Sequence, residues 1–205
     1  MPHVSIIDTT LRDGAQAPGV SFSGSQRLTL ARELELLGVD EIEAGLPANG
    51  EAACQSMRQI VASVRRCRVT GWCRATEADL AAAASCGLAS VHVSVPVSPT
   101  QLEAFGKSWD WVRDALRRLL PEARRRFAYV SVGAMDASRT PAERLTQLAK
   151  DVLQLAADRL RLADTVGVWN PAQTEMAVRA DRRAADDSSI GVHPHNDLGM
   201  ATANA

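Results

Sequence analysis

Two short polar segments of the chain carry side chains that could hold a metal ion. Arg12 and Asp13 stand in the first segment, and His193 and His195 stand in the second. Two histidines at positions i and i+2 of an extended segment project to one face, so both imidazoles can reach a single cation. A carboxylate from another strand end would complete a mixed nitrogen and oxygen site, which suits Mg, Mn, Fe or Zn.

Each segment, taken alone, also fits a simpler interpretation. His193 and His195 fit two histidines that are hydrogen-bonded at the top of a strand, and Arg12 with Asp13 fits a turn with a local ion pair. The metal interpretation gains weight because both segments directly follow expected strands, where the loops of a parallel barrel carry its functional groups. In a closed barrel the first and seventh strands are separated only by the eighth, so the two segments could converge.

Seven short apolar, β-branched runs predict strands, and the segments between them have apolar residues at helical spacing. The expected strands are 4–7, 39–42, 69–72, 91–95, 127–132, 160–163 and 190–192. Helix start and stop signals lie between them: a capping box at Thr76, a cap followed by proline at Ser98, Thr140 and Asn170, and terminal glycines at Gly38 and Gly87. Alternation of strand and helix predicts an α/β fold with a parallel sheet.

The strands recur about every 31 residues, and eight such units approach the roughly 250 residues of a (β/α)8, or TIM, barrel. By this spacing an eighth strand would begin near residue 221, roughly one strand-helix unit beyond the last expected strand. We therefore expect residues 1–205 to form a single catalytic-type TIM-barrel domain, truncated at its C-terminus, with about seven strands and without the eighth strand and last helices. A doubly wound sheet is the alternative, but no GxGxxG follows the first strand.

Composition narrows the classes of function. The 205 residues are 46% apolar and 23% charged with a net charge of -1, which is a globular composition without the basic surface that nucleic-acid binding needs. Because no apolar stretch approaches the ~20 residues of a membrane helix, we expect no membrane partner. The four cysteines show no CxxC pair and are expected to be buried thiols in a cytoplasmic protein.

Several motifs together resemble the metal-dependent Claisen-condensing barrels, which include homocitrate synthases, 2-isopropylmalate synthases, citramalate synthases and hydroxymethylglutaryl-CoA lyases, a domain class also called pyruvate carboxyltransferase-like. The motifs are DTTLRDG at 8–14 with Gln16, IEAGLP at 42–47, ADTVG at 163–167 and HPHND at 193–197. Further segments are most similar to the homocitrate synthases of nitrogen fixation: GWCR at 71–74, PVS at 96–98 and DASR at 136–139.

The resemblance implies a role for each of seven residues. It implies a divalent metal, Mg or Mn above all and otherwise Fe or Zn, bound by Asp13, His193 and His195. It implies that Arg12 is catalytic, because it places positive charge against the oxyanion that develops. It implies substrate contacts from Gln16, Glu43 and Thr165; without the family context, Thr165 reads better as a hydroxyl that caps the turn after a strand.

The implied reaction is acyl transfer, in which acetyl-CoA condenses with a 2-oxo acid, foremost 2-oxoglutarate to give homocitrate. Three departures from the family pattern stand against full activity. Ala15 replaces a usual Glu, and Met135 replaces the Glu of a Gly-x-Glu-Asp pattern. The resemblance also implies an asparagine metal ligand in a loop after the eighth strand and a C-terminal part of the acetyl-CoA site, which we expect this chain to lack. The alternatives are a catalytically degenerate or split partner subunit, and activity of the 2-isopropylmalate or citramalate synthase kind. We expect a homo-oligomer or a complementary C-terminal chain as the protein partner, because open sheet edges recruit other chains.

Overall fold

A computed structural model describes residues 4–185 and 189–205. Contacts divide the chain into two compact units. The first comprises Met1–His92 with Arg126–Ala128, and the second comprises Val93–Arg125 with Tyr129–Ala205. Each unit is described by itself, and strand β4 contributes residues to both.

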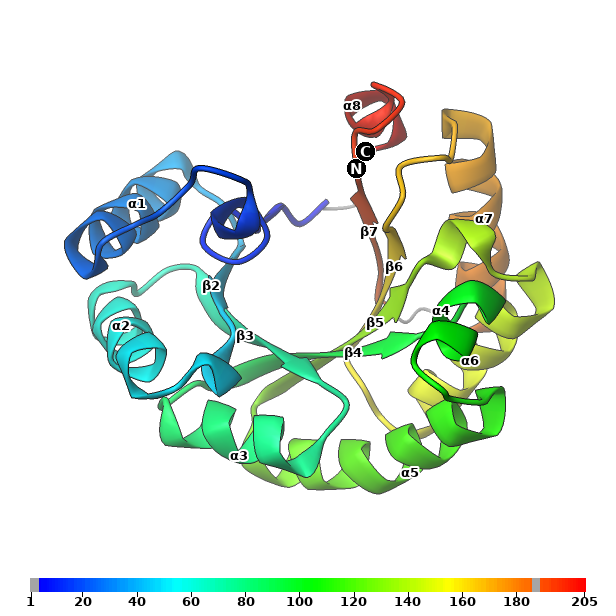
Figure 1. Cartoon of the computed structure of the whole chain (residues 1–205), viewed down its shortest axis with the longest axis horizontal. Coiled ribbons are helices and arrows are strands. Elements are labelled where there is room, and N and C mark those ends of the chain that lie inside the picture. The colour runs from blue at the N-terminus through cyan, green and yellow to red at the C-terminus, as the bar shows by residue number, and fades with distance from the viewer. Residues whose placement is uncertain (1–3, 186–188) are drawn as a thin grey trace. The chain divides into compact units, whose positions relative to one another are not determined.

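The first unit repeats a strand and a helix (Figure 1). Its elements are β1 (Ile7–Asp8), α1 (Gly24–Leu37), β2 (Glu41–Gly45), α2 (Glu51–Ser63), β3 (Arg68–Arg74) and α3 (Glu77–Ser85), with the short 3-10 helices η1 (Gly14–Gln16) and η2 (Pro47–Asn49). Helices α1 and α2 pack against each other and against β2. The strand β4 (Ser90–Pro96) begins in this unit and continues in the second.

The second unit continues the same repeat. Its elements are α4 (Pro99–Ala104), α5 (Trp109–Arg126), β5 (Tyr129–Met135), η3 (Ala137–Arg139), α6 (Ala142–Gln154), β6 (Arg159–Asp164), α7 (Pro171–Ala184), β7 (Ser189–Pro194) and α8 (Ala201–Asn204). Helix α7 packs against α6 and β7. Among residues 4–185 and 189–205, no helix combines the length and the hydropathy needed to cross a bilayer.

The strands are hydrogen-bonded in the order β1-β2-β3-β4-β5-β6-β7, which is their order along the chain. The pairs β1-β2, β2-β3, β5-β6 and β6-β7 are parallel. This order confirms the predicted α/β fold of the TIM-barrel type with seven strands. Some strand boundaries were wrong. A strand was expected at 4–7, but Val4 and Ile6 are exposed and only Ile7 and Asp8 pair with β2. The strands expected at 39–42 and 127–132 lie at Glu41–Gly45 and Tyr129–Met135.

The central strand, β4, is buried on both faces, one of them apolar and the other partly polar. Val91, Val93 and Val95 of β4 are fully buried, and so is the alternating set that starts at Ser90. A strand covered on both faces is typical of parallel sheets. The Ser90 hydroxyl shares a hydrogen bond of 2.8 Å with the Thr70 hydroxyl, so this polar pair costs little to bury.

Most helix signals act as the sequence predicts. Ser98 and Asn170 accept the backbone N–H three residues on, and Gly38 ends α1 in the left-handed conformation at φ 86°. Thr140 does not cap α6: Pro141 occupies the cap position, and the Thr140 hydroxyl donates to the Asp136 carbonyl at 2.9 Å. The Thr140 hydroxyl therefore bonds back to the η3 turn, and no side chain of the described residues caps α6.

The cysteines correct a second expectation. Cys54 and Cys86 form a disulfide, while Cys67 and Cys73 are free and only Cys73 of these two is buried. The bonded residues are 32 positions apart, and their Cα atoms come to 4.7 Å because α2 packs beside α3. Sequence spacing does not reveal that contact.

Candidate active site

The first unit builds one half of the candidate site around Arg12. After β1 the Thr9 carbonyl accepts the N–H groups of Arg12 at 3.0 Å and of Gly14 at 3.1 Å, which closes a tight turn. The Arg12 Nε donates to Glu43 Oε2 at 2.8 Å, and its Nη1 donates to Asp13 Oδ1 at 2.7 Å. The Glu43 side chain is fully buried. Two carboxylates therefore fix the guanidinium.

Trp72 of β3 makes a cation–π contact with the same guanidinium. The Arg12 Cζ lies over the Trp72 ring, 5.6 Å from its centroid. Two ion pairs and one aromatic ring thus hold the Arg12 side chain. A planar cation held in this way keeps one orientation, which a flexible lysine would not.

Two other polar residues of this segment differ in how they are held. The Asp8 carboxylate accepts the Thr10 N–H at 2.9 Å and the Thr10 hydroxyl at 3.1 Å, so it shapes the turn. Gln16 closes η1 by donating its N–H to the Asp13 carbonyl at 2.9 Å, and its side chain is exposed. Asp13 is one-quarter exposed. Both Asp13 and Gln16 are therefore accessible from solvent.

The second unit places the two histidines together at the end of β7. The ring centroids of His193 and His195 are 5.0 Å apart, with an angle of 58° between the ring planes. The His195 N–H donates to the Asp164 carbonyl at 3.3 Å, which ties the segment after β7 to the end of β6. The i, i+2 spacing thus brings two imidazoles to one place, as an extended segment requires.

Strand register aligns Met135 of β5 with His193 of β7 across the sheet. Met135 pairs with Ala163, and Ala163 pairs with His193. Paired residues of parallel strands project to the same face of a sheet. The thioether of Met135 therefore lies on the face of His193, two strands away.

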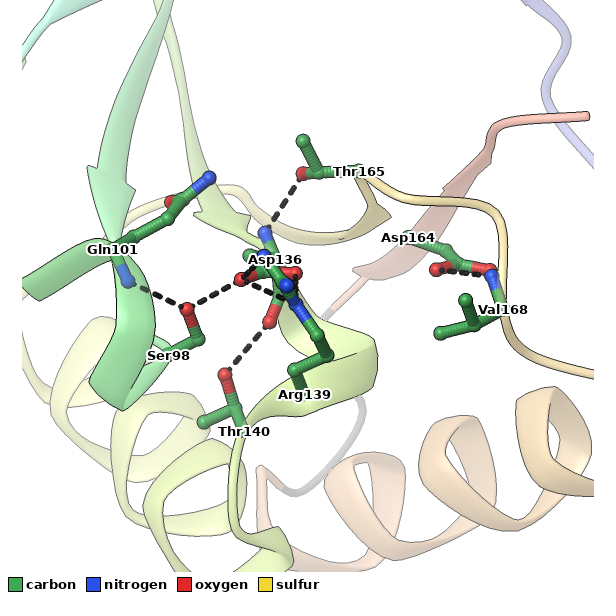
Figure 2. Close-up of polar contacts among 8 residues, drawn as sticks. All are labelled: Ser98, Gln101, Asp136, Arg139, Thr140, Asp164, Thr165 and Val168. Atoms are coloured by element: carbon green, nitrogen blue, oxygen red, sulfur yellow. Dashed lines mark hydrogen bonds and ion pairs between the residues drawn. The ribbon is translucent and has the colours of Figure 1, made fainter. Parts of the chain in front are cut away.

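Asp136 is the centre of a polar cluster at the ends of β4, β5 and β6 (Figure 2). Its buried carboxylate accepts hydrogen bonds from the Ser98 hydroxyl and from Arg139, whose Nη2 is 2.7 Å away. Its N–H donates to the Thr165 hydroxyl at 2.8 Å. Asp136 adopts the left-handed conformation at φ 62°, and these contacts offset the strain.

Thr165, expected to contact substrate, has a structural contact as well. Because its hydroxyl oxygen accepts the Asp136 N–H, the hydroxyl keeps its own proton to donate. The neighbouring Asp164 carboxylate accepts the N–H groups of Val168 at 3.1 Å and Trp169 at 2.9 Å, which shapes the loop after β6. This loop carries the ADTVG motif.

Sequence reasoning missed three of these contributors. The motif GWCR contained Trp72, but nothing in it indicated contact with Arg12. Asp136 appeared only as part of a motif, because the expected strand ended at 132 whereas β5 continues to Met135, directly before it. Arg27, whose role is described below, stands within α1 with no motif around it, so no local signal marks it.

Parallel strands that each lead into a helix, with charged and imidazole groups placed just after the strands, define the class of (β/α)8-barrel proteins. Comparison with known proteins is more specific, because the sequence matches the HMGL-like family over residues 3–205. The chain belongs to the HMGL-like family.

Curated relatives cover nearly the whole chain. A homocitrate synthase of Frankia alni is 41% identical over 98% of this chain and 57% of its own length. A 2-isopropylmalate synthase of Caldanaerobacter subterraneus is 38% identical over 98% of this chain and 53% of its own length. A homocitrate synthase subunit alpha of Clostridium pasteurianum is 34% identical over 98% of this chain and 75% of its own length. The chain thus spans about half the length of the first two relatives.

Solved structures agree on the fold. The HMG-CoA lyase of Bacillus subtilis superposes with a TM-score of 0.83 at 21% identity, over 98% of this chain and 71% of the lyase. The carboxyl transferase domain of Rhizobium etli pyruvate carboxylase reaches a TM-score of 0.78 at 16% identity, over 98% of this chain and 37% of that chain. At this identity the likeness establishes the fold alone.

Proposed function

We propose that this chain is the catalytic barrel of a metal-dependent acyltransferase that condenses acetyl-CoA with a 2-oxo acid, foremost 2-oxoglutarate to homocitrate. The observation that carries the proposal is the pair of adjacent imidazoles at the end of β7, 5.0 Å apart, in a chain of the HMGL-like family. Relatives named homocitrate, 2-isopropylmalate and citramalate synthases support the condensation, while the choice among 2-oxo acids rests on the motifs shared with homocitrate synthases. We also propose a cytoplasmic location. The free thiols of Cys67 and Cys73 support it, whereas the Cys54–Cys86 disulfide is of a kind that is rare in that compartment.

The proposed metal ligands are Asp13, His193 and His195. Imidazole nitrogen and carboxylate oxygen form a donor set that suits Mg or Mn and also accommodates Fe or Zn. The two rings lie side by side, as ligands of one cation must, and Asp13 is accessible. When bound, the cation would polarise the ketone carbonyl of the 2-oxo acid.

Arg12 would stabilise negative charge on the oxygen of the attacked ketone. Glu43 and Asp13 hold its guanidinium in place before substrate arrives, so little reorganisation is needed when charge develops. Glu43 contributes to the substrate site through this ion pair. Gln16, with its exposed amide, and Thr165, with a hydroxyl proton to donate, are proposed to bind the carboxylate groups of the 2-oxo acid.

Release of free thiol from acetyl-CoA tests the reaction. The assay uses the chain with Mn or Mg and a panel of 2-oxo acids: 2-oxoglutarate, 2-oxoisovalerate, pyruvate and glyoxylate. We expect metal-dependent thiol release that is fastest with 2-oxoglutarate. Equal release without any 2-oxo acid would indicate hydrolysis instead and would contradict a condensation.

Calorimetric titration with Mn tests the ligands independently of turnover. We expect Asp13→Ala and His193→Ala each to abolish tight binding while the fold is kept, because Asp13 follows β1, His193 stands near the end of β7, and both are partly exposed. Asp114→Ala, which removes an exposed carboxylate of α5, is the matched control and should bind as the wild type does. Undiminished affinity in both ligand variants would refute the assignment.

A second candidate function is a partner subunit that keeps the metal site without independent catalysis. Two observations favour it: Met135 aligns with His193 across the sheet, and the Clostridium pasteurianum relative is named as a subunit. Metal binding without thiol release, followed by thiol release on addition of a complementary chain, would support this candidate over the first.

A further inference from the structure

Arg27 of α1 reaches into the segment that carries the candidate catalytic residue. Its Nη2 donates to the Leu11 carbonyl at 2.7 Å and to the Ala44 carbonyl at 2.6 Å. Leu11 directly precedes Arg12, and Ala44 directly follows Glu43. One nitrogen therefore joins the two backbone positions that flank the Arg12–Glu43 ion pair.

The chain leaves room for this contact at Gly45. A Cβ atom at that position would lie 3.1 Å from Arg27 Nη2 and 3.1 Å from the Met57 methyl carbon. Gly45 also has φ 134°, a conformation that residues with side chains rarely adopt. Both the space and the backbone conformation thus let the guanidinium approach the end of β2.

Strand pairing alone does not fix the distance between the two partners of the ion pair. The recorded register of β1 and β2 joins Ile7 to Glu41 and Asp8 to Ile42, and Arg12 lies four residues beyond it. Past that point the chain turns, so its position relative to β2 depends on other contacts. The two Arg27 hydrogen bonds span this gap.

We propose that Arg27 is a positioning residue that sets the placement of Arg12 against Glu43 and Trp72. The inference rests on the proposed function only in giving Arg12 a catalytic role. Arg27 is half-buried, and loss of solvation lowers the pKa of its guanidinium below the ordinary value. Hydrogen bonds from a charged donor to two carbonyls offset that loss.

Fluorescence of Trp72 reports the placement of Arg12 without any need for turnover. The background replaces Trp109, Trp111 and Trp169 by Phe, so that Trp72 alone emits. Arg12→Met, Arg27→Met and the double variant then form a double-mutant cycle. Arg32→Met, which removes an exposed arginine of the same helix that bonds the Ser63 hydroxyl at 3.3 Å, is the matched control.

We expect Arg27→Met to shift the Trp72 emission in the direction that Arg12→Met shifts it, with a double variant no further shifted than Arg12→Met. Arg32→Met should leave the emission unchanged. The inference would be overturned if a folded Arg27→Met variant had the emission of the wild type. It would also be overturned if the shift of the double variant equalled the sum of the two single shifts. If Arg27→Met does not fold, Arg27→Lys is read by the same criteria, because lysine keeps the charge but has a shorter reach.

A second measurement links the placement to substrate. With Mn present, we expect Arg27→Met to weaken 2-oxoglutarate binding roughly 10-fold or more, because small misplacements of a binding group are costly. The control Arg32→Met should leave 2-oxoglutarate binding unchanged. Should the wild type bind no 2-oxo acid while the fluorescence cycle behaves as described, the proposed function fails and the role of Arg27 stands. Should binding occur and survive Arg27→Met undiminished, the role of Arg27 fails alone.

Discussion

Arg12 shows how much of the candidate chemistry depends on a single side chain. Its Nε and Nη1 contact two carboxylates at 2.8 and 2.7 Å, and its Cζ lies over the Trp72 ring at 5.6 Å from the centroid. These contacts require a planar group with donors on two edges, which lysine cannot supply.

Arg12→Lys therefore keeps the charge and loses the geometry. We expect thiol release to fall roughly 100-fold or more, as on removal of one oxyanion donor, while Mn binding is little changed. The measurement is the acetyl-CoA assay alongside calorimetry. Unchanged turnover would mean that Arg12 only shapes the turn after β1.

Met135 aligns with His193 across the sheet, at the position where the family resemblance implies a Glu. A thioether is a weak acceptor and cannot relay a proton. If the missing carboxylate limits turnover, Met135→Glu should raise metal-dependent thiol release roughly 10-fold or more, because positioned acid–base groups contribute at least that much. Met135→Gln, of similar shape without a charge, is the control, and equal rates for both variants would show that the carboxylate is not what is missing.

Asp181 of α7 gives a pH-dependent prediction. Its side chain is buried, its Oδ2 has no hydrogen-bond partner, and burial raises its pKa to about 7, against a smaller opposite effect of a hydrogen bond with Thr146. The folded state thus holds a proton that the unfolded chain releases near pH 4, so this group's stabilising contribution is lost as pH rises from about 4 to 7.

At pH 8 we expect Asp181→Asn to have a free energy of unfolding up to about 4 kcal/mol above that of the wild type. At pH 4 the two proteins should differ little. Urea unfolding at the two pH values measures this difference. Glu175→Gln, at an exposed position on the same helix, should show no such change. An equal gain for Asp181→Asn at both pH values would contradict the argument.

At the scale of elements, the sequence predicted the strands and helix caps, because these depend on residues that are close together in the chain. All seven strands and the caps at Ser98 and Asn170 were foreseeable, because alternation, β-branching and cap chemistry are local. Contacts between distant segments were not. The Arg27 hydrogen bonds join residues 16 and 17 positions apart, and the Cys54–Cys86 disulfide joins residues 32 positions apart.

The site residues also divide into those that a local pattern could place and those whose contacts join distant segments. His193 and His195 could be placed together because i and i+2 share a face of a strand. Arg12 and Glu43 are 31 positions apart, and the family motifs marked both as site residues without indicating their ion pair. Trp72 gave no signal of its cation–π contact, since an aromatic residue in a strand is more often a packing residue.

The disulfide between α2 and α3 belongs to this scale. Closing a loop of 32 residues should stabilise the fold by about 3–4 kcal/mol through loss of chain entropy in the unfolded state. We expect Cys54→Ser to lower the free energy of unfolding in urea by that amount, and Cys67→Ser, which removes a half-buried free thiol, to leave it within about 1 kcal/mol. Alkylation of four thiols in the unfolded, unreduced wild type would contradict the bond.

At the scale of the whole molecule, the order of strands leaves two outer members among the described residues. β1 pairs with β2 and stands first in the order, and β7 pairs with β6 and stands last. Each has exposed apolar side chains nearby: Val4 and Ile6 are 78% and 61% exposed beside β1, and Leu198 is 60% exposed after β7. Backbone groups of outer strands together with apolar surface favour pairing with another chain.

We therefore expect the chain to self-associate or to bind a complementary chain that supplies further strands. Light scattering should show a species larger than the 22.0 kDa monomer, and Ile6→Lys should shift it toward the monomer, because a charge on an outer strand blocks pairing. Arg32→Lys, at an exposed position of α1 with its charge kept, is the control. A complementary chain would raise the melting temperature of the mixture in proportion to its binding. The opposite result would be a monodisperse wild-type monomer whose melting temperature is unchanged by any added chain. It would show that both outer strands are covered within the molecule. The partner-subunit candidate would then lose its physical basis.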